Sequence, residues 1–229
     1  MANYILHIDT ASSNGLVMLG KSGVPVAIRR NEKAMEHAAF VQPAIRDLMQ
    51  ETGISQTDIG CIAVANGPGS YTGLRVGLAA AKGLCYAWNI PLLTLSSLQL
   101  MAAALQETLL HNHEIIPANA LFAPMIDARR MEVFRAVYSH PLLDTVVEPG
   151  AEILTEEFLA IFFENHPVYF CGDGADKWQN ICTHPNAFFY KQPPVEMVFA
   201  KMASYLSKKE DWADIAYSEP FYTKAFHNT

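Results

Sequence analysis

Apolar residues in this chain form short continuous runs and longer runs with helical spacing. The first three runs, at 4–8, 16–19 and 24–30, are short and rich in β-branched and aromatic residues, which is typical of strands. Asn14-Gly15 lies between the first two, and an Asn-Gly pair is a strong hairpin signal. The chain is therefore expected to open with an antiparallel meander.

Helices and strands then alternate. A helix is predicted over about 36–52, because its apolar residues recur at three- and four-residue spacing and Gly53 follows it. A strand at 61–65, a helix at 74–88, a strand at 92–95 and a helix from Ser96 or Ser97 to about 110 come next. In the second half the predicted strands are 121–126, 132–138, 168–171 and 187–190, and the predicted helices are 155–164, 175–182 and 195–207.

The order of elements, a meander followed by alternating helices and strands, occurs once and then again more loosely. This order predicts an α/β fold of the actin-like ATPase (RNase H-like) type, with two related subdomains of which the second is reduced. The expected subdomains are 1–100 and 101–229, with the helix near 195–207 as a candidate to pack back on the first. The tail after Asp211 is expected to be irregular.

Composition narrows the class of protein. Of the 229 residues, 51% are hydrophobic and 17% are charged, which indicates a folded chain with one large core or two smaller ones. The net charge of −7 disfavours unaided tight binding to nucleic acid. No apolar run approaches the roughly 20 residues that span a bilayer, and no signal peptide is recognised. We therefore expect a cytoplasmic protein that does not enter membranes.

Cys61 and Cys171 lie in apolar strand-like runs and are expected to be reduced core thiols. The cysteines are widely spaced along the chain and form no CxxC pair, so the sequence does not suggest a zinc site. The four residues are Cys61, Cys85, Cys171 and Cys182.

The glycine-rich stretch 66–77 holds the most information. It follows a predicted buried strand and opens a helix, so the free N–H groups at the helix start could face an anion. Its glycine spacing does not match a Walker A loop, a GxGxxG dinucleotide turn or a GxSxG nucleophile elbow. The simpler interpretation is a tight turn with Ser70 or Thr72 as the helix cap.

The predicted helix 74–88 is unusually rich in small residues. Glycine inside a helix costs about 1 kcal/mol relative to alanine, a cost that is tolerable where another backbone must approach closely. Arg75 and Lys82 are its only charges and lie seven residues apart, on nearly the same face. Tight packing on the chain's own sheet and contact with another subunit both explain this composition. The small residues are Gly77, Ala79, Ala80, Ala81, Gly83 and Ala87.

Several motifs, in the same order and at matching separations, resemble those of the TsaB (YeaZ) family. The glycine turn 67–77 is the most specific of them, and the opening 5–11 and the turn 171–175 also match. The stretch 125–134 is similar to the family's second hairpin, with Met131 where glycine is common. The end at 220–224 carries Lys224 where arginine is usual.

The resemblance implies a function without catalysis. TsaB proteins are shortened, inactive relatives of TsaD, the subunit that transfers threonylcarbamoyl to adenosine in tRNA. They pair with TsaD through their first domains, form homodimers when alone, and the small ATPase TsaE docks on the pair. By this resemblance tRNA is reached only indirectly, and ATP or ADP at a shared interface is a candidate ligand. The implied partner-interface residues are Gly67, Pro68, Gly69, Ser70, Tyr71, Thr72, Gly73, Arg75, Val76, Gly77, Ala80 and Lys82.

The residues that would hold a metal in TsaD-like proteins are not matched here. That family uses an HxxxH pair on the helix after the first domain, and the matching positions hold Ser97 and Met101, which do not suit a catalytic iron or zinc site. His111 and His113 come later, at the expected end of this helix, and the chain has no HExxH. We therefore expect no catalytic residues, no metal and no required cofactor.

The main alternative is a weak nucleotide-binding ATPase of the actin-like type. Asp9 follows the first strand, where such ATPases keep a magnesium-directing carboxylate, and Asp127 and Arg129 are also candidates to lie near a nucleotide. A turn-forming role is the competing interpretation for Asp9. Turn hydrogen bonds or an ion pair are the competing interpretation for Asp127 and Arg129. His7 is expected to be structural, and a ligand role for His37 is not favoured.

Overall fold

The computed structural model describes residues 4–31, 36–155 and 157–223. The chain divides into two compact units, which are described separately below. The first combines 1–97 with 196–221, and the second spans 98–195 and continues from Tyr222. The helix expected near 195–207 therefore belongs to the first unit. Among the described residues every helix is too short or too polar to cross a bilayer.

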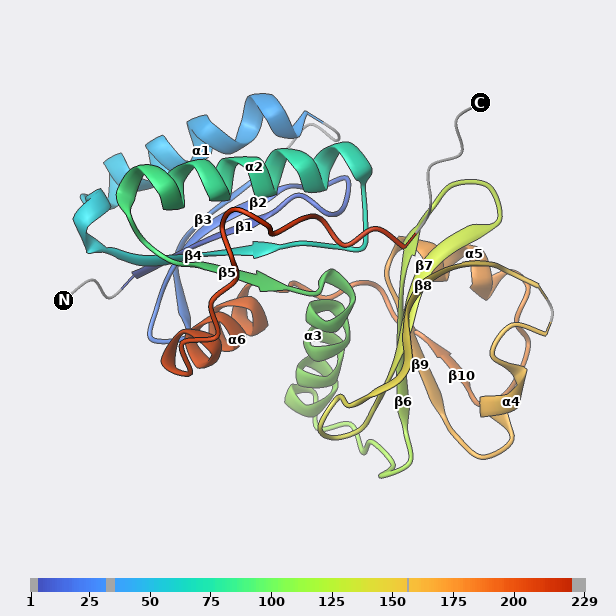
Figure 1. Cartoon of the computed structure of the whole chain (residues 1–229). Helices are drawn as coiled ribbons and strands as arrows, with labels where there is room; N and C mark the ends of the chain where they lie inside the picture. The colour runs from blue at the N-terminus through green and yellow to red at the C-terminus, as the bar shows by residue number, and fades with distance from the viewer. Residues whose placement is uncertain (1–3, 32–35, 156, 224–229) are drawn as a thin grey trace. The chain divides into compact units, whose positions relative to one another are not determined.

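The first unit is built on a five-stranded mixed sheet (Figure 1). Its strand order is β3-β2-β1-β4-β5; β1, β2 and β3 pair antiparallel, whereas β1, β4 and β5 pair parallel. The predicted meander is confirmed. The strands are β1 (Tyr4–Asp9), β2 (Leu16–Lys21), β3 (Val24–Arg30), β4 (Ile59–Ala65) and β5 (Leu92–Leu95).

The two hairpins of the meander are joined differently. Ser22 and Gly23 connect β2 to β3 with φ angles of 53° and 79°, the left-handed backbone that a tight two-residue hairpin turn requires. Asn14-Gly15 does not make such a turn, because β1 ends at Asp9 and six residues, 10–15, precede β2. The longer loop carries Thr10 and Ala11 to the glycine-rich turn, where both make contacts described below.

Helices cover both faces of the first sheet (Figure 1). Helices α1 (His37–Thr52) and α2 (Tyr71–Trp88) lie side by side on one face, and α6 (Glu196–Lys208) lies on the other. Apolar residues of α1 and α2 at helical spacing pack on strand residues such as Leu6, Ile8 and Ile62 to form the core. Gly53 ends α1 in the left-handed conformation, as its position after the periodic run predicts.

The segment after α6 returns along the first unit without forming a helix or a strand. The N–H of Ala213 donates to the carbonyl of Leu92 (2.8 Å) at the edge of β5, and the N–H of Phe221 donates to the carbonyl of Asn66 (2.7 Å). Lys82 Nζ donates to the carbonyls of Ala216 and Ser218 at 3.1 and 3.0 Å. The irregular tail is therefore tied to the first unit at three places.

The second unit repeats the topology of the first. Its strand order is β10-β9-β6-β7-β8. If the strands of each unit are numbered one to five along the chain, both sheets have the order 3-2-1-4-5, and the parallel and antiparallel pairs occur between the same strands. This repeat confirms the predicted fold of two related halves. The strands are β6 (Leu121–Asp127), β7 (Glu132–Ser139), β8 (Thr145–Ile153), β9 (Val168–Cys171) and β10 (Ala187–Phe189).

The reduction of the second unit lies in its helices rather than in its sheet. Helix α3 (Ser97–His111) packs on one face, whereas α4 (Ala160–Phe163) and α5 (Asp173–Gln179) are short. The helix predicted over 155–164 was wrong in length, and strand β8 was missed. Strand β8 contains Pro149 and Gly150 and lies at the sheet edge with no buried residue, so it shows neither an apolar run nor clean alternation.

The two glycines within α2 have opposite environments, and this difference gives a matched test. A Cβ on Gly77 would lie far inside van der Waals distance of Thr10 Oγ1, whereas a Cβ on Gly83 would meet nothing within 4 Å. The Thr10 hydroxyl cannot move aside freely because it donates to the Gly73 carbonyl (2.7 Å). We expect Gly77→Ala to lower the free energy of unfolding by about 1–3 kcal/mol and Gly83→Ala to raise it by about 1 kcal/mol.

Urea denaturation of the two variants measures both effects. Equal effects of the two substitutions would contradict the close contact between α2 and Thr10.

Candidate functional site

The glycine-rich turn connects β4 to α2 and is fixed from both sides. Ser70 is the N-cap of α2, and its Oγ accepts a hydrogen bond from the N–H of Gly73 (3.3 Å). The N–H of Ser70 in turn donates to the carbonyl of Ala11 (2.7 Å). Of the two predicted caps, Ser70 therefore serves and Thr72 does not. Gly67 has φ 117°, a conformation that L side chains rarely adopt.

The glycines of the turn allow a close approach of two backbones. A Cβ on Gly69 would collide with the carbonyl oxygen of Ala11, and one on Gly73 would collide with that of Thr10. A Cβ on Gly67 would lie 2.8 Å from the carbonyl oxygen of Phe221. The turn is thus packed between the β1–β2 loop and the C-terminal segment of the same chain.

The predicted interface residues divide into buried and accessible groups. Five of them are buried within the first unit, so contact with a partner would require the turn to open; they are Gly67, Pro68, Gly69, Gly73 and Gly77. Ser70, Val76, Ala80 and Lys82 are half-buried, and Tyr71, Thr72 and Arg75 are exposed. Gly77 faces Thr10 and Ile8, so a large charged side chain there would disturb the fold rather than only a surface.

The outer face of α2 exposes small residues that were not among the predicted interface residues. Ala79 and Gly83 are exposed and follow Arg75 at helical spacing, and Tyr86, one turn further, exposes 84% of its surface. The Arg75 guanidinium lies over the Tyr71 ring, 4.0 Å from its centroid. The spacing from Arg75 was the signal in the sequence, but only the structure shows which side of the helix the sheet covers.

Helix α1 extends this surface. It packs beside α2 on the same face of the sheet, and its outer residues include Ala38, Gln42 and Arg46, all exposed. His37, at its first turn, is buried instead, with its ring against Gly15 and Gly73, and burial lowers its pKa. His37 therefore helps to hold the glycine turn rather than to contact a ligand.

Asp9 lies at the end of β1 in a small charged cluster. Its Oδ1 accepts a hydrogen bond from the N–H of Ala11 (2.9 Å), which is the turn-forming role. Arg30 forms an ion pair with Glu196, a buried residue at the start of α6, and both charges act on Asp9. Burial raises the pKa of Asp9 to about 6, while the Ala11 N–H and Arg30 oppose this shift.

Asp127 and Arg129 lie in the second unit and make turn contacts. The N–H of Arg129 donates to Asp127 Oδ1 (2.6 Å), and Lys177 forms an ion pair with Asp127. The N–H of Asp127 donates to Asp173 Oδ1 (2.8 Å). Burial raises the pKa of Asp173 and the nearby Asp127 charge adds to this rise, whereas the hydrogen bonds from backbone N–H groups oppose it. Asp127 and Arg129 are therefore joined by a turn hydrogen bond, and Asp127 forms an ion pair, as the competing structural interpretation expects.

The positions corresponding to the HxxxH pair are both buried. Ser97 begins α3, and Met101 packs in the core of the second unit, where its Cε lies close to Gly172. A hydroxyl and a thioether are poor ligands for a catalytic iron or zinc, so these residues do not fit such a metal. His111 and His113 are exposed. In the part of the chain that the structure describes, no three His, Cys, Asp or Glu side chains converge as a metal site would need.

Comparison with known proteins agrees with the motifs. The family model for TsaD, described as tRNA N6-adenosine threonylcarbamoyltransferase, matches residues 31–218. A Bacillus subtilis protein named tRNA threonylcarbamoyladenosine biosynthesis protein TsaB is 31% identical over 73% of this chain and 70% of its own length. An Escherichia coli protein of the same name is 37% identical over 43% of this chain and 42% of its length.

The fold has solved relatives. A Pseudomonas aeruginosa crystal structure, described as an uncharacterized protein with similarity to peptidase YeaZ, has a TM-score of 0.77 at 22% identity, covering 97% of this chain and 100% of that one. A second structure, YeaZ from the same organism, has a TM-score of 0.76 with 96% and 99% coverage, also at 22% identity. At this identity the likeness concerns the fold.

The raised pKa of Asp9 predicts a pH-dependent contribution to stability. The folded chain holds this proton more tightly than the unfolded chain, so stability from this group falls as pH rises between the ordinary value of 3.8 and about 6. Burial lowers the pKa of His7 from 6.5 to about 4. Stability from His7 therefore rises with pH over this range, which overlaps the range in which stability from Asp9 falls. We therefore expect the difference in unfolding free energy between the wild type and Asp9→Asn to change by about 1–3 kcal/mol across the window.

Urea denaturation on either side of the two pKa values measures this difference. Asp214→Asn is the matched control, because Asp214 is exposed and its Oδ1 accepts from the N–H of Ala216 (2.7 Å) in a similar turn. If the difference for Asp9→Asn is no more pH-dependent than that for Asp214→Asn, the Asp9 carboxyl is not perturbed as described.

Proposed function

Because the chain belongs to the TsaB family, we propose that it is a non-catalytic scaffold subunit for forming threonylcarbamoyladenosine in tRNA. Its matched relatives are named as biosynthesis proteins for this modification, and the family model is that of the transferase TsaD. In this proposal the chain pairs with TsaD and holds it in its active arrangement, while the transfer to adenosine 37 of tRNA takes place on TsaD.

The exposed face of α2 is the observation that carries the proposal. Ala79 and Gly83 leave the helix backbone accessible over two turns, and Tyr71 and Tyr86 stand at the two ends of this stretch. Small residues let a second helix approach closely, and tyrosine is enriched in the cores of protein interfaces. The face fits a helix of a partner subunit, with α1 providing the neighbouring part of the contact.

The scaffold role also agrees with the chemistry of the described residues. The two positions that carry histidine in TsaD-like proteins are Ser97 and Met101 here, and Asp9, Asp127 and Arg129 are engaged in turns. None of these contacts prepares a nucleophile or a general base. In this proposal TsaE binds the assembled pair, and the isolated chain forms a homodimer. The complex rather than this chain contacts tRNA, because the chain carries a net charge of −7.

Nucleotide binding is the second candidate function, with ATP or ADP bound here or at an interface shared with TsaD. It rests on the position of Asp9 at the end of β1, where the loop 10–15 meets the N-terminus of α2. We expect isothermal calorimetry of the purified chain with ATP and magnesium to give no heat at millimolar nucleotide. Saturable heat that disappears with Asp9→Asn would instead favour nucleotide binding by this subunit.

The pairing surface can be tested by adding bulk to it. Ala79→Arg places a long charged side chain on the exposed face of α2 without entering the core, so we expect folding to be kept and pairing with TsaD to weaken by at least about 100-fold. Light scattering of the mixed proteins measures the pairing, and the transfer of threonylcarbamoyl to tRNA by the reconstituted proteins should fall with it.

Ala160→Arg is the control, because Ala160 is an exposed alanine on α4 of the second unit. Unchanged pairing of Ala79→Arg would place the contact elsewhere. Transfer of threonylcarbamoyl by this chain in the absence of TsaD would contradict the scaffold role itself.

A further inference from the structure

Strand β3 is an edge of the first sheet, and three of its four exposed residues are apolar. Val24, Val26 and Ile28 expose 53%, 49% and 37% of their surfaces. They share the face of β3 that carries Arg30, which pairs with Glu196 of α6. Among the described residues no strand pairs with the outer side of β3. Unpaired backbone groups beside apolar side chains are the features that an added strand uses.

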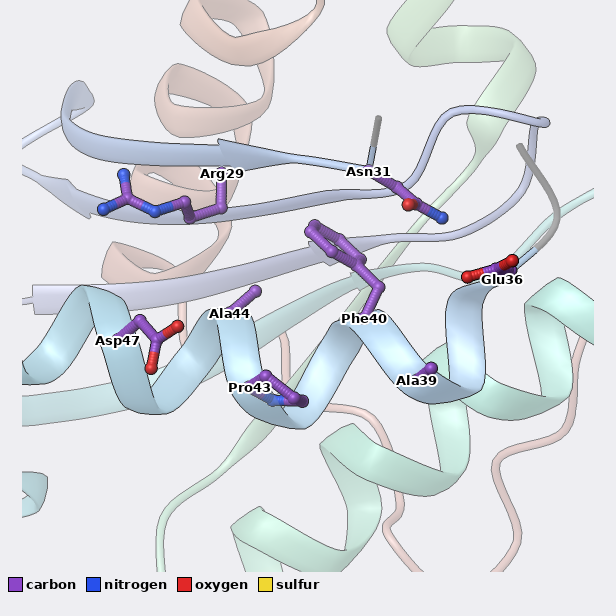
Figure 2. Close-up of a pocket in the computed structure, with 8 residues that line it drawn as sticks. All are labelled: Arg29, Asn31, Glu36, Ala39, Phe40, Pro43, Ala44 and Asp47. Carbon is purple, nitrogen blue, oxygen red and sulfur yellow. The ribbon is translucent and has the colours of Figure 1, made fainter. Parts of the chain in front are cut away.

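A pocket of about 270 Å³ lies on the other face of the same edge, between β3 and α1. Figure 2 shows the Phe40 ring in the middle of it, pointing from α1 toward β3, with Glu36 and Asp47 at opposite ends. Ala39 and Pro43 form the outer part of its α1 wall. The pocket therefore has an aromatic centre and a carboxylate at each end.

Hydrogen-bond acceptors dominate the α1 wall of the pocket. Pro43 has no N–H, so the carbonyl oxygen of Ala39, four residues earlier, lacks its usual donor within the helix. Glu36 adds a carboxylate, and Asp47 adds a second one that forms an ion pair with Arg46 (2.8 Å). Arg29, the cation that lines the pocket, forms an ion pair with Glu51. An aromatic ring surrounded by acceptors suits the ammonium or guanidinium group of a lysine or arginine side chain.

We propose that the β3 edge and this pocket together bind an extended basic segment of another protein, added to the sheet as a sixth strand. Side chains alternate between the two faces of a strand. One set would lie against Val26 and Ile28 and be apolar, and the other would enter the pocket beside Phe40 and be basic. Pro25 lacks an N–H, and the register between β2 and β3 shifts at Val26, so the regular pairing stretch is 27–30.

Charge identifies the occupant. A second copy of this chain would bring another net charge of −7 and would be repelled at long range, whereas a basic segment is attracted. The nearby arginines do not reverse this preference, because Arg29 is paired with Glu51, Arg30 with Glu196 and Arg46 with Asp47. The preference for a basic segment therefore rests on Glu36, the Ala39 carbonyl and the net charge of the chain. The site lies on β3 and the α1 wall that faces it, and it does not use the outer face of α2.

The test uses the full chain and the labelled peptide Val-Arg-Val-Arg-Val-Arg, with Val-Glu-Val-Glu-Val-Glu as the acidic counterpart. We expect saturable fluorescence anisotropy with the basic peptide only, and amide shifts in NMR spectra centred on 27–30 and the α1 residues of the pocket. Val26→Lys should weaken binding by at least about tenfold, because it places a cation against the incoming strand. Glu36→Gln should also weaken it.

Val146→Lys is the matched control, because Val146 exposes 44% of its surface on β8, the corresponding edge strand of the second unit. Ala79→Arg should bind the peptide as the wild type does, which separates this site from the proposed TsaD contact.

Three outcomes would overturn the inference. The chain could bind both peptides equally or bind neither of them; Val146→Lys could weaken peptide binding as much as Val26→Lys does; or the chain could self-associate in a way that Val26→Lys abolishes. The last result would make the β3 edge a contact between two copies of this chain.

Discussion

The close approach of the β1–β2 loop to the glycine turn is the contact on which the first unit depends. The backbones of Thr10 and Ala11 lie where side chains at Gly69 and Gly73 would otherwise be, and the Thr10 hydroxyl donates to the Gly73 carbonyl (2.7 Å). This contact fixes the start of α2 relative to β1. It determines which face of α2 the sheet covers and which face remains available, so the proposed partner surface follows from an internal packing constraint.

The C-terminal segment fixes the other side of the same turn. The N–H of Phe221 donates to the carbonyl of Asn66, and Lys82 Nζ donates to two carbonyls of the segment. Lys82 was expected at a partner interface by resemblance, but its charge is already engaged within the chain. A motif can therefore be typical of a protein family because it shapes a surface, even where many of its residues do not lie on that surface.

Two different kinds of surface arise from one sheet. The outer face of α2 has small residues between two exposed tyrosines and is proposed to receive a helix, whereas the β3 edge combines exposed apolar side chains with a pocket and is proposed to receive a basic strand. The β5 edge differs from the β3 edge because the C-terminal segment reaches it through the Ala213 to Leu92 contact. Since no described segment covers the outer side of β3, the proposed extension of the sheet is at this strand.

The sequence alone determined the fold class and most elements, because apolar periodicity and glycine position reflect local physics, and its motifs indicated the family by resemblance. Strands β3, β5 and β9 have the predicted bounds. It did not reveal β8, whose edge position gives no apolar run, or the shortness of α4. It also did not show that Gly77 faces the sheet and Gly83 faces outward, because this depends on which side of α2 lies against the neighbouring strand. The cluster of Asp9, Arg30 and Glu196 joins residues distant in the chain. Only tertiary packing decides such contacts, since no local pattern records which distant backbone will lie against a given residue.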